Sequence, residues 1–380
     1  MAALTEEQSL LKDQAKAWAT EQAPVQTFRE MRDSGVEQRY VATTWESMVE
    51  MGWTGILIPE QYGGSDLGYL TFGVVLEELG RQLTASPLFA SALAGTSAVL
   101  IGADEDQKAA LLPKIVDGSE ILTLAIDEGA HHRPDHVSVT ASEEGNDFVL
   151  NGHKNMVVEG MAVTTLVTSV RTSDASGAAE GMTLLLVPAE SDGLQRSALA
   201  TVDSRGYAKV SFENVRVPRE SVIGEVGSGR RVLEATLDRA RAGLGAEMIG
   251  TAAQAFDMTL DYLKTRKQFG RVIGSFQALG HRAAALFSSM ELSRSCAENA
   301  LQVIDAGGTD QEIARAASLS KARVGRFLFE MSNQLIQIHG GIGMTDEFDA
   351  GFYLKRARVL EALYGNRAYH KDRYARLLDF

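Results

Sequence analysis

The chain has 380 residues and a net charge of -13 at pH 7, and its 45% hydrophobic and 23% charged residues are ordinary for a globular protein. This length predicts two or three packed domains, because single domains usually run to about 100–200 residues. The acidic balance argues against nucleic acid and anionic lipid as partners, so an anionic ligand needs a local basic pocket.

Cys296 is the only cysteine, which excludes an internal disulfide framework and a thiolate-based metal site. Residues 1–22 are polar and helical in pattern, unlike a signal peptide. No uncharged apolar run reaches the roughly 20 residues that a membrane-spanning helix needs. We therefore expect a cytoplasmic protein with no membrane partner and no metal site.

The first part of the chain, residues 1–119, is expected to form an α-helical domain. Thr5 and Gln8 have the spacing of a capping box, and apolar residues then recur at helical intervals. Further helices, separated by glycine and proline, are predicted at residues 45–51, 70–83, 88–101 and 106–116.

The pattern changes to period-two alternation in the middle of the chain, where a small β-domain is expected over residues 120–225. Short strands are predicted at residues 137–140, 148–150, 163–170, 183–187 and 208–212. Helical periodicity returns in a third domain, residues 226–380, where the long segments predict a helical bundle. These segments are residues 229–266, 275–305, 310–339 and 349–378.

Two glycine-containing stretches interrupt the long helices. Residues 262–277, YLKTRKQFGRVIGSFQ, predict a helix that ends in a basic, glycine-broken loop, and a helix corner would explain them. In residues 337–345, QIHGGIGMT, two adjacent glycines stop a helix and allow close approach of another group, although a plain C-cap is the simpler explanation. The adjacent His131 and His132 are interpreted as a solvated turn.

These stretches resemble the acyl-CoA dehydrogenase family, and the resemblance covers nearly the whole chain. Residues 58–64, 75–80 and 205–229 are similar to the N-terminal and β-domain signatures of that family. The resemblance implies a fold that is mostly α with a small central β-domain, made of a helical N-terminal domain, a β-sandwich or barrel, and a C-terminal four-helix bundle. It also implies the α,β-dehydrogenation of an acyl-CoA thioester, as in fatty acid β-oxidation, with FAD as cofactor and electron-transfer flavoprotein as acceptor.

The resemblance assigns residues to cofactor and substrate. In the family a carboxylate removes the α-proton while the β-hydrogen leaves as hydride to the flavin. Contacts with FAD across a subunit boundary are expected from Arg266, Gln268 and Phe269. The ADP part of FAD is expected at Gln337, Gly340 and Gly341. Arg241 is expected to contact the substrate.

The usual base position of the family is not a carboxylate in this chain. The family places a glutamate in a Tyr-Glu-Gly-Thr segment downstream of the paired glycines, and counting from Gln337 puts Tyr364 there. A phenol with an ordinary pKa near ~10 cannot replace a carboxylate base. Some relatives take the glutamate from the position before an arginine in the long helix, where this chain has Ala240.

Glu247 is the remaining candidate base. It lies seven residues past Ala240, on the same helix face and about 10 Å further along, and it is the only charged residue in residues 242–256. Desolvation would suit a general base, because an unpaired buried carboxylate tends to hold its proton. The alternative is a structural ion pair with a neighbouring helix or subunit.

The predicted β-domain also departs from the family pattern. Residues 127–135 read DEGAHHRPD where relatives carry Thr-Glu-Pro-Gly followed by Gly-Ser-Asp, and Met156, Val157 and Val158 replace the Trp-Ile-Thr wall of the flavin. The residues that would bind this subunit's own flavin are therefore altered. The residues that would contact the flavin of a neighbouring subunit match the family pattern. This asymmetry predicts a hetero-oligomer with a second acyl-CoA dehydrogenase-like subunit, as in some bacterial members.

Three other interpretations stay open at this point. The chain could be a self-sufficient homotetrameric dehydrogenase that uses Glu247, or it could perform other flavin chemistry. It could also be a non-catalytic binding or scaffolding protein of the same fold.

Overall fold

The computed structural model describes residues 4–172 and 181–380. The chain divides into two compact units, each built from separate segments. We call them the sheet unit, Arg29–Gly68 and Ala85–Ala240, and the helical unit, Met1–Phe28, Tyr69–Thr84 and Arg241–Phe380. The division into three consecutive domains at 119/120 and 225/226 stays a prediction.

The sheet unit contains short helices and one mixed sheet. Its helical elements are α3 (Ala42–Glu50), the 3-10 turns η1 (Trp53–Gly55), η2 (Glu60–Tyr62) and η4 (Arg219–Ser221), the π-helix η3 (Phe89–Gly95), α5 (Thr96–Gly102) and α6 (Glu105–Val116). The strands are β1 (Leu122–Ala125), β2 (Thr140–Glu144), β3 (Asp147–Val158), β4 (Thr165–Arg171), β5 (Met182–Pro188), β6 (Leu194–Ala198), β7 (Tyr207–Pro218) and β8 (Val222–Ile223).

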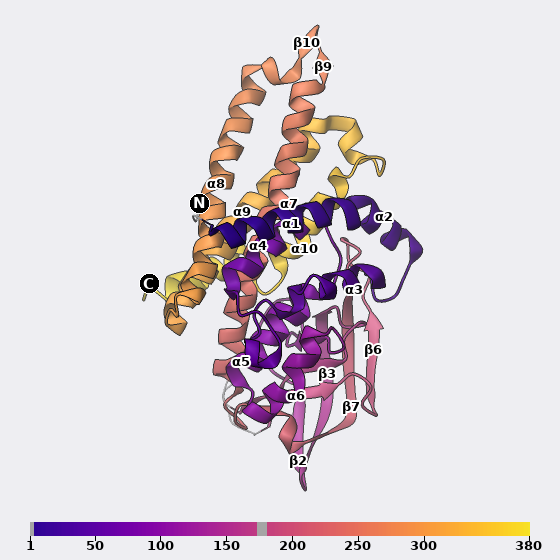
Figure 1. Cartoon of the computed structure of the whole chain (residues 1–380), viewed down its shortest axis with the longest axis vertical. Helices are drawn as coiled ribbons and strands as arrows, with labels where there is room; N and C mark the ends of the chain where they lie inside the picture. The colour runs from indigo at the N-terminus through magenta and orange to yellow at the C-terminus, as the bar shows by residue number, and fades with distance from the viewer. Residues whose placement is uncertain (1–3, 173–180) are drawn as a thin grey trace. The chain divides into compact units, whose positions relative to one another are not determined.

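The strands pair in the order β6-β7-β3-β2-β4-β5-β8 in the described residues, and β1 pairs in parallel with β4. Figure 1 labels β6, β7, β3 and β2 of this sheet. The long β3 and β7 pair antiparallel, with register shifts at residues 150–152 and 154–157 that bend the pair. Val157 and Val158 are buried at the end of β3, beyond the second shift, and Met156 in the shift itself adopts a positive φ of 52°.

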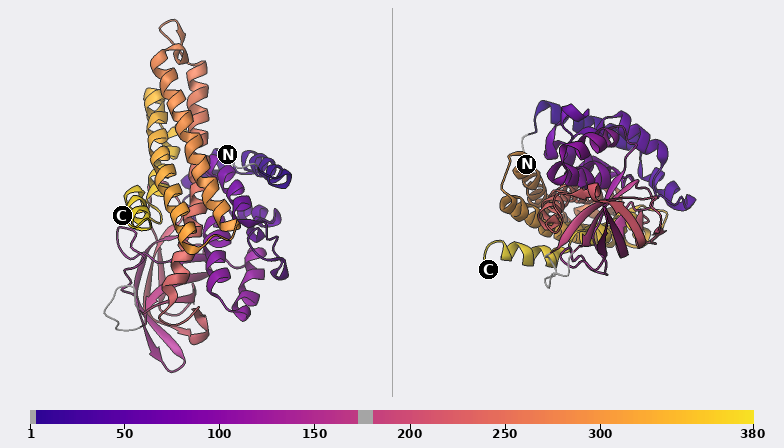
Figure 2. Two further views of the ribbon diagram at one scale, coloured as in Figure 1. Left: turned by 90° about the vertical axis from the view of Figure 1, so that its left-hand side faces the viewer. Right: turned by 90° about the horizontal axis from the view of Figure 1, so that it is seen from below.

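The helical unit is dominated by long helices. Its elements are α1 (Glu6–Gln22), α4 (Gly68–Arg81), the part of α7 (Gly229–Thr265) from Arg241 onward, β9 (Lys267–Gln268), β10 (Arg271–Val272), η5 (Ile273–Ser275), α8 (Gln277–Asp305), α9 (Asp310–His339), η6 (Gly340–Met344), α10 (Ala350–Ala362) and α11 (Arg367–Arg376). The helix α2 (Val25–Ser34) crosses the boundary between the units. Within the helical unit, α8 and α9 lie side by side and the β9–β10 hairpin joins α7 to α8 (Figure 2).

Two glycines bring α4 and α7 into backbone contact. A Cβ added at Gly80 would overlap the carbonyl oxygen of Glu247, and one added at Gly250 would overlap that of Glu77. Only a residue without a side chain fits at either crossing point. The VLEELG motif of residues 75–80 therefore has a packing role in this unit.

The predicted mostly α fold with a central β-domain is confirmed, and local predictions differ in places. The single helix predicted at residues 349–378 is wrong, because Tyr364 and Gly365, with φ of 53° and 107°, break it between α10 and α11. The strand predicted at residues 137–140 begins only at Thr140, and β1 and β6 were not predicted. Among the described residues every helix is too short or too polar to cross a bilayer.

Candidate functional site

The stretch expected to contact FAD forms an exposed hairpin at the end of α7. β9 and β10 pair antiparallel, and the two residues between them, Phe269 and Gly270, have φ of 53° and 78°. Two successive positive φ values match the tight turns that suit the twist of a hairpin. The turn leaves the Phe269 side chain 90% exposed, and Arg266 and Gln268 are exposed as well. The Phe269 ring meets that of Phe276 edge-on, with centroids 6.1 Å apart, and an aromatic ring left this exposed suits contact with another molecule.

The second stretch ends α9 with an open surface. Gly340 terminates the helix with a φ of 65°, and a Cβ added at Gly340 or Gly341 would meet nothing within 4 Å. Gln337 is exposed on the last turn. The backbone here is accessible to a ligand.

His339 connects the two stretches within the helical unit. Its ring is stacked between those of Tyr262 and Phe348, with centroids 4.3 and 4.7 Å away, and Tyr262 Oη lies 3.4 Å from the His339 carbonyl oxygen. Tyr262 begins the hairpin motif and His339 precedes the paired glycines, so the structure brings the two predicted motifs together.

The tautomer of His339 follows from its surroundings. Nδ1 lies 2.7 Å from the carbonyl oxygen of Leu335, which can only accept, so Nδ1 carries the proton. Burial lowers the pKa of His339, so the ring is neutral and Nε2 is an acceptor. This buried Nε2 has no hydrogen-bond partner among the described residues.

The residues of the two stretches fit FAD. The cofactor carries ribose and ribityl hydroxyl groups and an adenine amine that could donate to a buried acceptor such as His339 Nε2. The open glycine pair permits close approach, and the exposed guanidinium of Arg266 suits a diphosphate. When bound, FAD would supply the hydride-accepting flavin, while these side chains bind and orient it.

Glu247 is held in an ion pair. Its Oε1 accepts hydrogen bonds from Arg356 Nη2 at 2.6 Å and Nε at 3.2 Å, and both side chains are about one-tenth exposed. The arginine comes from α10, 109 residues further along the chain. The geometry is that of a structural ion pair between helices, the alternative weighed from the sequence.

Tyr364 is buried in the turn between α10 and α11, and two side chains hold its backbone carbonyl group. Its carbonyl oxygen accepts from Arg241 Nε at 3.1 Å and from His370 Nε2 at 3.1 Å. Burial, followed by the charges of Arg241 and Lys321, lowers the pKa of His370, so this imidazole donates as a neutral group. Arg241, expected at the substrate, is fully buried and fixes this turn instead of presenting its guanidinium to solvent.

Lys321 reinforces the same turn from α9. Its fully buried Nζ donates to the carbonyl oxygens of Leu360 at 2.7 Å and Glu361 at 3.4 Å, near the end of α10. Burial lowers the pKa of Lys321 to about 7. Sequence reasoning missed this residue, because nothing in the pattern of α9 distinguishes it from a surface lysine.

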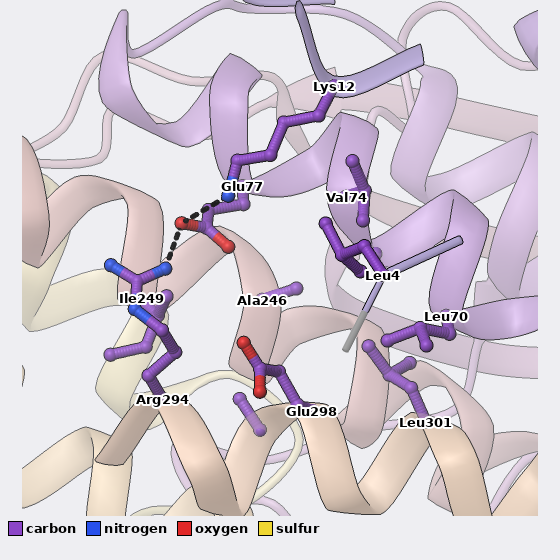
Figure 3. Close-up of a pocket in the computed structure, with 12 residues that line it drawn as sticks. Leu4, Lys12, Leu70, Val74, Glu77, Ala246, Ile249, Arg294, Glu298 and Leu301 are labelled. Carbon is purple, nitrogen blue, oxygen red and sulfur yellow. Dashed lines mark hydrogen bonds and ion pairs between the residues drawn. The ribbon is translucent and has the colours of Figure 1, made fainter. Parts of the chain in front are cut away.

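A small cavity lies among α1, α4, α7 and α8, beside Ala246 and Ile249 on the α7 stretch that carries Glu247 (Figure 3). Its volume is about 20 Å³, which is room for roughly one water molecule. Glu77 sits at its wall, held by Arg294 and by Lys12, whose Nζ lies 3.5 Å from Glu77 Oε1. This cavity is too small for an acyl chain.

The altered segment of the sheet unit has its own network. Glu128 pairs with the buried Lys154 at 2.8 Å, and Asp127 pairs with His132 at 2.8 Å. The prediction that both histidines form a solvated turn is therefore wrong for His132, whose side chain is 4% exposed, while His131 is exposed. His132 is buried and His131 is exposed because only His132 pairs with the carboxylate of Asp127.

The family assignment comes from sequence comparison. The description "Acyl-CoA dehydrogenase, N-terminal domain" matches residues 5–119, and "Acyl-CoA dehydrogenase, C-terminal domain" matches residues 227–378. The chain is 32% identical over 331 residues to the mitochondrial 2-methylacyl-CoA dehydrogenase of Solanum tuberosum, covering 84% of this chain and 78% of that protein.

Solved structures agree with the sequence comparison. A chain in the structure titled "Electron transferring flavoprotein of Acidaminococcus fermentans: Towards a mechanism of flavin-based electron bifurcation" has a TM-score of 0.92 at 27% identity, covering 100% of this chain and 99% of that one. A variant of the Tcur3481-Tcur3483 steroid ACAD has a TM-score of 0.88 at 28% identity, with 98% of each chain covered. The chain therefore belongs to the acyl-CoA dehydrogenase family of FAD-dependent oxidoreductases that act on CH–CH bonds.

Proposed function

We propose that this chain is one of two unlike subunits of an acyl-CoA dehydrogenase and that it completes FAD sites held mainly by its partner. The observation that carries the proposal is the contrast between two regions. The hairpin residues Arg266 and Phe269 are exposed and match the family pattern, whereas Met156 and Val158 replace the flavin wall.

The sheet unit lacks groups that would bind a flavin in this chain's own half of the pocket. Val158 is buried and aliphatic, so it has no hydroxyl to donate where relatives carry threonine. In the neighbouring loop the Asp127 and Glu128 carboxylates are engaged by His132 and Lys154. These ion pairs stabilise the loop and use the donor groups of His132 and Lys154, which are then not available to a flavin.

The candidate bases of this chain also support a site that is completed by a partner subunit. Within this chain Glu247 is a better proton acceptor than Tyr364, because a phenol stays protonated near neutral pH. The ion pair with Arg356 at 2.6 Å already engages Glu247, so proton abstraction by it would require the pair to open. We therefore assign the base to the partner subunit, with Glu247 as the base only if the chain acts as a homotetramer.

The substrate class is an acyl-CoA thioester, and electron-transfer flavoprotein is the proposed electron acceptor. A bulky acyl group is the more attractive substrate, since the Tcur3481-Tcur3483 structure is described as a steroid ACAD and its name joins two designations. Fatty acyl-CoA of simple chain is the other candidate within the same class.

The test is to express the chain alone and together with a second family member that carries a glutamate base. We expect acyl-CoA-dependent flavin reduction only from the co-expressed pair. A yellow, active homotetramer of this chain alone would contradict the proposal and favour the homotetrameric alternative. A co-purified pair whose flavin is not reduced by acyl-CoA would favour a scaffolding role.

A further inference from the structure

Three aromatic rings stack where the hairpin motif and the glycine pair meet in the helical unit. The His339 ring lies between those of Tyr262 and Phe348, and the planes of these two rings are 31° and 33° from its own. We call these three residues the ring stack. His339 is 3% exposed, whereas Tyr262 and Phe348 are half-buried. The two cofactor motifs are thus connected through a buried ring that is able to take up a proton.

The surroundings of His339 suit only the neutral ring. Nδ1 donates to the carbonyl oxygen of Leu335 at 2.7 Å, and the buried Nε2 has no hydrogen-bond partner among the described residues. A Cβ added at Gly343 would lie 3.1 Å from the His339 Cβ, so the backbone of η6 also packs against this side chain. Protonation would turn Nε2 into a charged, buried donor without an acceptor, which is a costly state.

No ionised group in the described parts of the chain pairs with His339. Residues 331–338, which precede it on α9, and residues 340–344 of η6 carry no charge. The charged residues that flank the other two rings lie on α7 and between η6 and α10, and they are Asp261, Lys264, Asp346, Glu347 and Asp349. The pKa of His339 is set by burial, which lowers it, and to a smaller extent by the Leu335 carbonyl group, which raises it.

The sign of the effect of pH follows from this environment. In an open stack the imidazole meets water and has an ordinary pKa near ~6.5, whereas burial holds the pKa below that value in the closed stack. As the pH falls below ~6.5, the open stack takes up a proton that the closed stack excludes, so acid favours opening. Opening separates the rings and breaks the hydrogen bond of 3.4 Å from Tyr262 Oη to the His339 carbonyl oxygen.

We propose that the ring stack is a pH-sensitive connection, which holds the hairpin and the glycine pair together around FAD at neutral pH and opens to release FAD when His339 is protonated. Arg266 lies four residues after Tyr262, and Gly340 directly follows His339, so separation of the rings displaces both motifs. The release of FAD rests on the proposed function, whereas the opening of the stack rests on the contacts of His339 alone.

The first experiment measures the rate at which the co-purified assembly releases FAD at pH 7.5 and at pH 5.5, by flavin fluorescence after dilution. We expect release from the wild type to be severalfold faster at pH 5.5, with a limit of about tenfold that an open-state pKa of ~6.5 sets. In His339→Phe the rates at the two pH values should be nearly equal, because phenylalanine stacks but takes up no proton. His339→Gln should lose the pH response as well.

The matched control is His281→Gln, an exposed histidine on α8, which should keep the wild-type ratio of the two rates. An equal acceleration in His339→Phe and the wild type would overturn the proposal, because acid would then act elsewhere. Slower release at pH 5.5 would also overturn it, because the protonated ring would then hold the cofactor more tightly.

Hydrogen exchange of the full chain without FAD separates this proposal from the proposed function. After correction for intrinsic rates, amides of residues 262–266 and 339–345 should open more often at pH 5.5 than at pH 7.5 in the wild type, and equally often in His339→Phe. If the assembly retains no FAD but the exchange shows this response, the ring stack stands and the proposed FAD sharing fails. Wild-type exchange that does not respond to pH overturns the ring stack whatever the FAD content.

Discussion

The aromatic ring of Tyr262 stacks on that of His339, with centroids 4.3 Å apart and the planes 31° from parallel. This contact joins the end of α7, which carries the β9–β10 hairpin, to the end of α9, which carries Gly340 and Gly341. Two residues that are 77 positions apart in the sequence therefore hold the ends of α7 and α9 together. The hairpin motif and the glycine-pair motif are thus held together at their Tyr262 and His339 ends.

Arg266→Ala should weaken retention of FAD by the assembly about tenfold, because it removes a charge-assisted contact with the diphosphate. FAD released on dilution, followed by flavin fluorescence, measures this. Lys264→Ala, which removes an exposed cation two residues earlier, near the end of α7, is the matched control and should retain FAD normally. Equal FAD loss in both variants would point to general electrostatics rather than to a contact by Arg266.

Tyr364→Phe should leave the rate of flavin reduction in the complete assembly near normal, because a buried phenol is not the base. Glu247→Gln should also spare this rate, since Arg356 already engages the carboxylate. Rapid-mixing measurement of flavin reduction by acyl-CoA, at matched FAD content, checks both. A loss of ~10²-fold or more in Glu247→Gln alone would place the base in this chain. If only Tyr364→Phe is inactive, the alignment that assigns the usual base position is wrong.

Gly250→Ala should destabilise the protein by about 1–3 kcal/mol, since its Cβ would overlap the carbonyl oxygen of Glu77 where α4 crosses α7. Gly351→Ala is the control. Gly351 lies in α10 and a Cβ there meets nothing within 4 Å, so that change should be neutral or stabilising by roughly 0.5–1 kcal/mol. Urea unfolding compares the two variants, and equal stabilities would contradict the close approach of the helices.

Lys321 should make the stability depend on pH. Its pKa is about 7 in the folded protein and 10.5 ordinarily, so between these values the unfolded chain binds a proton that the folded chain lacks. The free energy of unfolding should therefore rise with pH across this window. Urea unfolding at pH 7 and pH 9 should show the rise in the wild type and a smaller one in Lys321→Met. Lys371→Met, at an exposed position on α11, should behave like the wild type, and an equal rise in all three proteins would exclude Lys321 as its source.

Much of the fold could be predicted because local rules decide it. Thr5 and Gln8 form the predicted capping box, and the periodicity of residues 310–339 matches α9 with its own cap at Thr309. The break at Tyr364 could not be predicted from helix periodicity. It depends on a tyrosine held at φ of 53° by Arg241 and His370, which are distant in sequence or lie beyond the turn.

The site was predicted unevenly for a similar reason. Paired glycines and a glycine-containing turn can be recognised in the sequence itself. Gly340 and Phe269, which belong to these two motifs, both lie on open surfaces. The partner of Glu247 could not be read from the helix around it, because Arg356 comes from another helix 109 residues away.

The number of FAD molecules per chain tests the central claim most directly. The chain is co-purified with its partner subunit, the cofactor is released by denaturation, and flavin absorbance is compared with the amount of each polypeptide. Because Val158 and the loop at Asp127 lack the flavin-wall residues, we predict fewer FAD molecules than chains in the assembly. One tightly bound FAD for every chain would contradict the account and show that this subunit keeps a complete flavin site of its own.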